Sequence, residues 1–143
     1  DRKNQFEVGE PQITEVLREA NVTLDHEVVP LLRKDSLELT DADRRLILET
    51  VRKHPAGRFV VTHGTDTMVE TGKVLREAEG KTVVLTGAMQ PARFRFTDAV
   101  FNIATAVSAV QLLPQGVYIA MNGRIFVPER ARKNAEMNCF EEI

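Results

Sequence analysis

Apolar residues in this chain gather into short unbroken runs, which are separated by longer stretches with a helical period. The short runs predict β-strands at 26–32 (HEVVPLL), 58–62 (RFVVT), 81–86 (KTVVLT), 116–121 (GVYIAM) and 124–127 (RIFV). Runs without polar interruption are typical of parallel strands that are covered on both faces. Pro30 cannot donate a ladder hydrogen bond, so it places the first of these strands near a sheet edge or at a bulge.

The stretches between the strands predict helices. The first helix follows Pro11 and has an apolar stripe at Ile13, Val16, Leu17 and Ala20, and the second has one at Leu46, Ile47, Thr50 and Val51. The third starts at a capping box at 67–70 and runs to about Gly80. The fourth ends before Pro114 and has a stripe at Val100, Ile103, Ala104, Val107 and Val110. Thr40 is a good N-cap for the second helix, with Asp41 and Asp43 in its first turn. Alternating strands and helices predict one α/β domain over residues 1–143, with a three-layer, mostly parallel sheet and helices on both faces. The polar stretch 128–143 is expected to form a loop or a short helix.

Composition narrows the function classes. The 143 residues are 43% hydrophobic and 28% charged, which fits a globular domain. A net charge of -2 gives no electrostatic reason to expect a nucleic-acid or membrane partner. No apolar run approaches the ~20 residues of a membrane span, and the single cysteine, Cys139, cannot form an internal disulfide. His26, His54 and His63 lack ligand-like spacing, so no metal site is expected.

The clearest candidate for chemistry is VVTHGTDTM (60–68), where an apolar strand runs into small and polar residues before the next helix. Ligands of parallel α/β sheets bind outside the carboxyl ends of the strands, which is where this stretch is expected. Gly64 lets the backbone approach a ligand closely, Thr65 offers a hydroxyl, and Asp66 offers a carboxylate beside the free N–H groups of a helix start. Two simpler interpretations stay open: Thr-Asp-Thr is also ordinary capping chemistry, and His63 alone fits a hydrogen-bonded histidine at a strand end.

Two further segments carry polar groups at strand ends. Residues 86–91 (TGAMQP) are followed by alternating Arg and Phe at 93–96, which suits either base stacking on RNA or a loop wall, and the acidic balance favours the wall. Residues 121–124 (MNGR) are followed by Arg130, Arg132 and Lys133, which spacing alone assigns to a solvated face.

Taken together and in order, these segments resemble the bacterial-type L-asparaginase (asparaginase/glutaminase) family. VVTHGTDTMVET is similar to a family signature, VVLTGAMQPARFRFTDAVFNIATAV to its next strand, loop and helix, and GVYIAMNGRIFVPERARKN to its following strand and a later lysine. The resemblance runs from about Phe6 to Asn134. It implies the N-terminal, Rossmann-like domain of these enzymes, and hydrolysis of asparagine, or often glutamine, to the acid and ammonia without a metal or cofactor.

The resemblance also implies catalytic residues. Thr65 matches a threonine that lies beside the substrate amide and can orient or attack through water. Asp66 matches an aspartate that holds the substrate's α-amino group. Lys133, by its distance from Met121-Asn122, matches the lysine of a Thr-Lys-Asp arrangement and is the expected proton relay to the threonine. Such a lysine supplies the base that a weak hydroxyl nucleophile needs.

For the substrate, the resemblance assigns Ser36 to the carboxylate, and it gives Gly64 and Ala88 as backbone that approaches the substrate. The next family residue, often glutamine, contacts the amino group; here it is Leu37, which weakens the case for an α-amino acid substrate. The expected partner is a small-molecule amide. A homodimer or homotetramer and a cytoplasmic location are expected by analogy.

Two family features have no counterpart in this sequence. The family's other threonine, widely taken as the nucleophile, lies in a TGGT stretch at the end of a first strand, and no such stretch occurs here. Because a sheet without that central strand would have an open gap, we expect a strand with the nucleophile before Asp1. The family's second, C-terminal domain is also not represented. Two other functions stay open: a small-ligand binding module of the same fold, and an interaction protein that uses Arg93, Arg95, Arg130 and Arg132.

Overall fold

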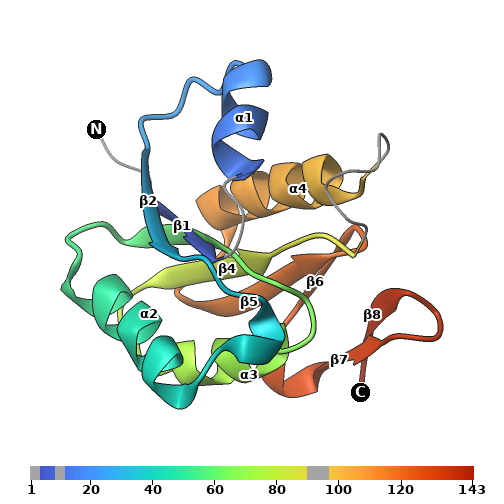
Figure 1. Ribbon diagram of the computed structural model, residues 1–143. Helices are drawn as coiled ribbons and strands as arrows, with labels where there is room; N and C mark the ends of the chain where they lie inside the picture. Colours follow the sequence, from blue (N-terminus) through green and yellow to red (C-terminus); the bar gives the residue numbers. More distant parts are fainter. Residues whose placement is uncertain (1–3, 9–11, 90–96) are drawn as a thin grey trace.

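The computed structural model describes residues 4–8, 12–89 and 97–143 and arranges them in three layers (Figure 1). The sheet contains β1 (Asn4–Val8), β2 (Glu27–Leu32), β3 (Arg58–Thr62), β4 (Thr82–Thr86), β5 (Gly116–Met121) and β6 (Arg124–Phe126). The helices are α1 (Gln12–Glu19), α2 (Asp41–Lys53), α3 (Met68–Leu75) and α4 (Ala99–Leu112). The strand order is β2-β1-β3-β4-β5-β6, and only β6 runs antiparallel to its neighbour. The predicted α/β fold with a mostly parallel sheet is confirmed.

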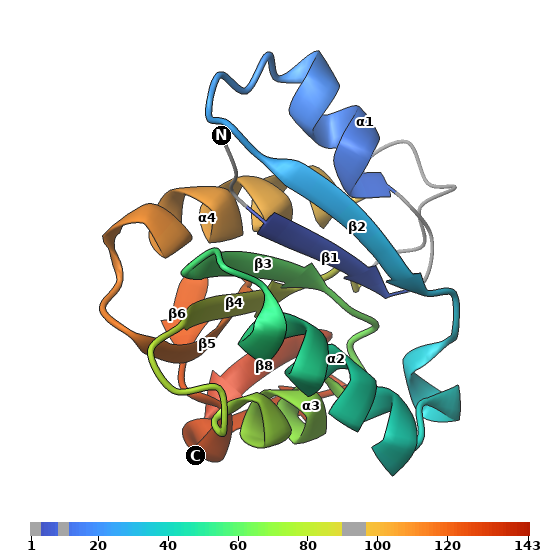
Figure 2. The same cartoon turned by 90° about the vertical axis from the view of Figure 1, so that its left-hand side faces the viewer.

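Helices cover both faces of the sheet, with α2 and α3 on one face and α1 and α4 on the other (Figures 1 and 2). Strand β3 shows why its residues are apolar at consecutive positions. Phe59 and Val61 pack into the cluster under α2 and α3, whereas Val60 packs into the cluster under α1 and α4. All three side chains are fully buried, as expected for a strand in the interior of a parallel sheet.

A strand that the apolar pattern does not predict lies inside the sheet, second from its edge. Strand β1 pairs with β2 on one side and with β3 on the other, so the described sheet has no open gap. The expected gap was the reason to predict a strand before Asp1. Since the described sheet lacks that gap, it does not support such a strand, which stays a prediction. Strand β2 lies at the edge of the sheet, where Pro30 is tolerated. Its register with β1 shifts between Glu7 and Val8, beside that proline.

Two helices bury most of the predicted stripe, including Ile47 and Val51 in α2 and Val107 and Val110 in α4, but single positions differ. In α2, Leu46 is 45% exposed and Leu48 is buried in its place. In α4, Val100 is 55% exposed and Ala104 is exposed as well, while Ile103 faces the sheet as predicted. Both helices carry apolar residues on more than one side, so tertiary packing chooses the buried face and the periodicity alone leaves it open.

The two predicted N-terminal caps have different outcomes. Thr40 Oγ1 accepts a hydrogen bond from the Asp43 backbone N–H, and the Asp43 carboxylate accepts one from the Thr40 N–H, so α2 begins with a full capping box. The predicted capping box at the start of α3 is wrong, because the Thr67 hydroxyl donates instead to Ser36 O at 2.7 Å. The Thr67 hydroxyl therefore bonds to a carbonyl of another element, η1, instead of capping its own helix. Helix α3 also ends at Leu75, earlier than predicted.

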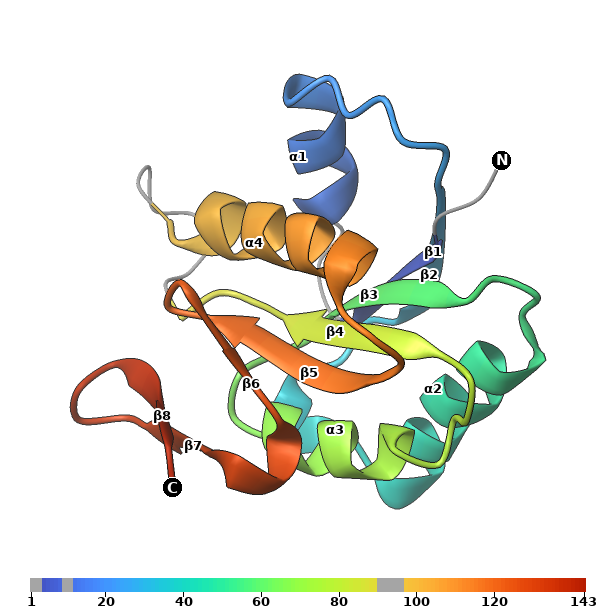
Figure 3. The same ribbon diagram turned by 180° about the vertical axis from the view of Figure 1, so that it is seen from behind.

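The polar C-terminal stretch begins with a short helical turn, but most of it forms strands that were not expected. After a short 3₁₀ turn, η2 (Pro128–Arg130), it forms an antiparallel hairpin of β7 (Ala131–Asn134) and β8 (Cys139–Glu142) beside the main sheet (Figure 3). Phe140 is 3% exposed and packs near Phe126 of β6. Arg132 and Glu141 pair across the two strands. One buried aromatic residue and polar cross-strand pairs produce little apolar periodicity, which explains why the pattern does not predict these strands.

Gly87, directly after β4, provides a test of this packing. A Cβ at Gly87 would lie 2.1 Å from His63 O, so Gly87→Ala forces the two strand-end loops apart. We expect it to lower the free energy of unfolding by about 1 to 3 kcal/mol. In the control Gly57→Ala the new Cβ meets nothing within 4 Å, and the change is expected to raise the free energy of unfolding by about 0.4 to 1 kcal/mol. Urea denaturation measures both, and equal stability of the two variants would contradict the described packing.

Candidate active site

The loop that follows β3 carries four of the residues singled out in the sequence: His63, Gly64, Thr65 and Asp66. His63 N donates a 2.9 Å hydrogen bond to Thr86 O of β4, so the pairing of the two strands continues past the end of β3. The loop then passes against the short turn η1 (Ser36–Glu38), where a Cβ at Gly64 would lie 2.8 Å from both Cβ and Oγ of Ser36. Gly64 is therefore required by its close approach to Ser36, whatever else it contacts.

Three of the predicted residues meet at one ammonium group. Lys133 Nζ, on β7, donates to Thr65 Oγ1 at 2.8 Å and to Asp66 Oδ1 at 2.6 Å. Thr65 is only 8% exposed, while the side chains of Lys133 and Asp66 are 22% and 45% exposed. A half-exposed ion pair contributes little to stability. An ammonium group that contacts both a hydroxyl and a carboxylate can, however, relay protons to or from a bound substrate.

Lys133 reaches this point because two contacts place the hairpin that carries it. A Cβ at Gly72 of α3 would lie 2.7 Å from Pro128 Cγ, so η2 packs directly on the helix. Phe140, which pairs with Lys133 across the hairpin, donates its backbone N–H to Asn122 Oδ1 at 2.7 Å. Asn122 has a φ of 55° and lies in the turn between β5 and β6. Asn-Gly between two apolar runs is a known hairpin signal and could have indicated the turn between β5 and β6. The contact of Asn122 with Phe140 was missed in the sequence, because it joins this turn to a second hairpin.

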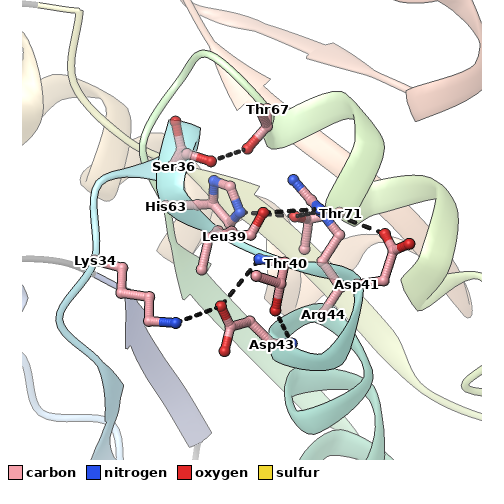
Figure 4. A network of polar contacts seen from close by, with 10 residues as sticks. All are labelled: Lys34, Ser36, Leu39, Thr40, Asp41, Asp43, Arg44, His63, Thr67 and Thr71. Atoms are coloured by element: carbon pink, nitrogen blue, oxygen red, sulfur yellow. Dashed lines mark hydrogen bonds and ion pairs between the residues drawn. The ribbon is translucent and has the colours of Figure 1, made fainter.

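Ser36 lies against the same loop with an unused hydroxyl. The residue is 1% exposed, and its Oγ has no hydrogen-bond partner among the residues that the structure describes. Its carbonyl oxygen accepts the hydrogen bond from Thr67, which ties η1 to the start of α3 (Figure 4). Buried hydroxyls are rarely left without a partner, so Ser36 Oγ is a candidate donor to a ligand. Leu37, in the same turn, is 71% exposed.

Ala88 lies at the neighbouring strand end, after β4. It is half-buried and packs against the apolar cluster on the α1 and α4 side. Within the described part of the chain, no hydrogen bond joins it to Thr65, Asp66 or Lys133. The structure therefore brings Ser36 and Gly64 against the Thr65 loop and leaves Ala88 one strand away. The alternating Arg and Phe residues at 93–96 lie outside the described residues.

His63 is the hydrogen-bonded histidine at a strand end that the simpler interpretation expects. The residue is 3% exposed, its Nδ1 lies 2.6 Å from Gly64 O, and its Nε2 lies 2.8 Å from Thr71 Oγ1. Burial lowers the pKa of His63 from 6.5 to about 4; the hydrogen bond to Gly64 opposes this shift, and the nearby charge of Arg44 adds to it. The imidazole is therefore neutral at pH 7.

Among residues 4–8, 12–89 and 97–143, no group of three or more His, Cys, Asp or Glu side chains is placed to hold a metal ion. None of the helices described there combines the length and the apolar character needed to cross a membrane. The polar groups gathered at the end of β3 are hydroxyls, one carboxylate and one ammonium group.

The fold and these groups define a three-layer α/β domain with a Thr-Asp-Lys cluster at the carboxyl end of its sheet. Comparison with known proteins identifies the family. The chain belongs to the asparaginase family, whose N-terminal domain ("Asparaginase, N-terminal") matches residues 2–143. The resemblance inferred from the sequence motifs is thereby confirmed.

Individual relatives agree with this assignment. The chain is 30% identical over 137 residues to a glutaminase-asparaginase of Acinetobacter glutaminasificans, covering 90% of this chain and 39% of that protein. It is 32% identical over 114 residues to L-asparaginase 1 of Escherichia coli (strain K12), covering 76% of this chain and 33% of that protein. A crystal structure of a probable cytoplasmic L-asparaginase from Campylobacter jejuni has the same fold, with a TM-score of 0.86 at 23% identity. That match covers 99% of this chain and 53% of the solved one, so the chain spans about a third to a half of the length of these relatives.

The lowered pKa of His63 predicts how stability depends on pH. The unfolded chain takes up a proton on this histidine below about pH 6.5, whereas the folded chain does so only near pH 4. The contribution of the neutral His63 to the free energy of unfolding is therefore complete above pH 6.5. It is lost as the pH falls toward 4, by up to about 3 kcal/mol. Urea denaturation between pH 4 and 7.5 should show a shallower acid loss for His63→Gln than for the wild type. The control His26→Gln should keep the wild-type slope, and parallel slopes for all three proteins would contradict the assignment.

Proposed function

We propose that this chain is part of an asparaginase-type amidohydrolase, which cleaves the carboxamide of a small amino-acid-like molecule to the acid and ammonia. The observation that carries the proposal is the contact of one ammonium group with both Thr65 and Asp66. Relatives named glutaminase-asparaginase and L-asparaginase support it. The proposed chemistry needs hydroxyl, carboxylate and ammonium groups, and no cofactor is part of it.

In this proposal, Thr65 lies beside the scissile amide and Lys133 relays protons. The hydroxyl of a threonine attacks the amide carbonyl carbon. Lys133, as the free amine in this step, takes the proton of that hydroxyl and gives it to the departing nitrogen, which leaves as ammonia. Water then adds to the ester, which releases the acid and restores the hydroxyl. Thr65 either makes the attack itself or orients the attacking water. Asp66 holds the ammonium group in place through a charge-assisted hydrogen bond of 2.6 Å.

Ser36, Gly64 and Ala88 are the proposed contacts to the substrate. A buried serine hydroxyl without a partner among the described residues suits a substrate carboxylate, because a hydroxyl donates one hydrogen bond. Gly64 and Ala88 would present backbone groups from the ends of two adjacent strands, β3 and β4. The half-exposed carboxylate of Asp66 would hold a substrate α-amino group. The substrate would then lie across the carboxyl edge of the sheet.

A second candidate function is a non-catalytic module that binds an amino acid or another small anion. The observation that favours it is Leu37, an exposed apolar residue next to Ser36 that cannot accept a hydrogen bond from an α-amino group. Calorimetry separates the two candidates. Tight ligand binding that depends on Asp66, without any turnover, would favour the module. An interaction function for the basic residues has less support, because Arg132 is already paired with Glu141.

The remaining family expectations carry over as proposals. We propose a homodimer or homotetramer that acts in the cytoplasm on a small-molecule amide, without a nucleic-acid or membrane partner. Light scattering of the purified protein measures the assembly state, and cell fractionation measures the location.

The relay role of Lys133 can be tested by Lys133→Met in the complete gene product. We expect ammonia release from the best substrate in a panel of asparagine, glutamine and small amides to fall by about 10²- to 10⁴-fold, because Thr65 loses its proton partner. The control Lys73→Met removes the same charge from an exposed position on α3 and should keep the wild-type rate. If the wild type turns over a panel amide and Lys133→Met is equally fast, Lys133 is not the relay.

A further inference from the structure

A buried guanidinium group lies beneath the proposed catalytic loop. Arg44, on α2, is 8% exposed. Its Nε donates to Thr71 Oγ1 at 3.0 Å and its Nη1 to Leu39 O at 3.3 Å (Figure 4). The nearest carboxylate, that of Asp41, is 3.8 Å away and fully exposed. A solvated ion pair of this kind offsets little of the cost of burying a cation, so the position of Arg44 calls for another explanation.

The hydrogen bonds around Thr71 begin at a fixed donor. Arginine is a donor and never an acceptor, so Thr71 Oγ1 accepts from Arg44 Nε. The Thr71 hydroxyl also lies 2.8 Å from His63 Nε2, and the protonation of the ring decides which of the two atoms donates. On the other side of the ring, the Gly64 carbonyl can only accept, so His63 Nδ1 must carry the proton. In a neutral ring Nε2 is then an acceptor, so the Thr71 hydroxyl donates to it. The hydrogen bonds from Arg44 through Thr71 to Gly64 are therefore consistent with the neutral Nδ1–H tautomer of His63.

The direction of the Thr71 hydroxyl is unusual for a helical threonine. Thr50 in α2 and Thr105 in α4 donate to the carbonyl oxygen four residues earlier, at 2.7 and 2.8 Å. Thr71 is fully buried, and its hydroxyl is directed to another element instead. Local backbone bonding is the usual choice for such a hydroxyl. The guanidinium group and the imidazole are therefore the hydrogen-bond partners that set the orientation of the Thr71 hydroxyl.

The end of this chain of donors is the peptide that precedes the Thr65 side chain. The Gly64 carbonyl and the Thr65 N–H belong to one planar peptide, and no described peptide is cis. The two groups therefore point in opposite directions, and a fixed Gly64 carbonyl fixes the Thr65 amide as well. Ser36 also confines this peptide, through the close contact at Gly64. Ser36 and His63 thus both contact the loop at Gly64, and Lys133 donates to Thr65 Oγ1 at the next residue.

We propose that Arg44 and Thr71 are positioning residues for Thr65: they hold His63 in the tautomer that fixes the Gly64–Thr65 peptide. The catalytic consequence rests on the proposed amidohydrolase function, whereas the effect on the imidazole and the peptide does not. Neither residue touches the substrate in this account. Arg44 donates to the Thr71 oxygen, and the Thr71 hydroxyl in turn donates to Nε2 of the His63 ring. The charge of Arg44 also disfavours protonation of the His63 imidazole. In a protonated ring, Nε2 would carry a hydrogen and could no longer accept the hydrogen bond from Thr71.

The kinetic test compares Thr71→Val, which removes the hydroxyl at nearly constant volume, with Thr71→Ser, which restores it. In the complete gene product, Thr71→Val should lower kcat by about 10- to 100-fold and leave KM nearly unchanged, because the reacting groups are misplaced rather than removed. Thr71→Ser should recover most of the rate. Arg44→Met should follow Thr71→Val, and Thr105→Val, which removes a local helix hydroxyl, should match the wild type. A wild-type kcat for folded Thr71→Val would overturn the proposal.

The second arm needs no activity. Long-range ¹H–¹⁵N spectra of the imidazole report its tautomer, and the backbone amide of Thr65 reports the peptide. The wild type should show a single neutral Nδ1–H form, and Thr71→Val and Arg44→Met should show a mixed tautomer with a shifted Thr65 amide. Unchanged His63 and Thr65 signals in both variants would overturn the proposal. If the wild type hydrolyses no amide, the proposed function fails, and this arm alone decides the inference.

Discussion

The candidate site depends on one ammonium group that joins distant parts of the chain. Lys133 reaches Thr65 and Asp66 from a hairpin outside the main sheet, so neither the sheet nor α3 can complete the cluster alone. The hydrogen bond between Asn122 and Phe140 and the packing of η2 on α3 hold that hairpin in place. Without this docking, the hydroxyl and the carboxylate would remain at the end of β3, but they would lack their cation.

The loop that receives Lys133 is held more rigidly than its exposure suggests. Ser36 packs against Gly64, and a series of hydrogen bonds from Arg44 through Thr71 and His63 reaches the Gly64 carbonyl. These contacts are buried, whereas the ion pair that they support is partly open to water. A fixed support beneath an accessible reactive group is the arrangement that precise positioning requires.

Much of the fold could be predicted from the sequence, but the site could be predicted only in part. The parallel strands are apolar on both faces, so their runs are easy to recognise, and the capping box of Thr40 and Asp43 has a clear local signature. Thr65 and Asp66 were candidates from their place after a predicted strand, whereas Lys133 was identified only by resemblance to a family, because no spacing rule places a lysine beside a threonine 68 positions away. The hairpin and β1 lack apolar periodicity. Burial of Arg44 depends on acceptors from other elements, which a single helix pattern does not contain.

The candidate site requires Thr65, Asp66 and Lys133 to converge on a bound substrate. A crystal structure of the complete gene product soaked with L-aspartate, the acid product of asparagine hydrolysis, tests it most directly. We predict a side-chain carboxylate of the ligand against Thr65 Oγ1, its α-carboxylate at Ser36, and Lys133 Nζ within about 3.5 Å of both Thr65 and Asp66. A ligand bound elsewhere, with Lys133 turned away from both residues, would contradict the account.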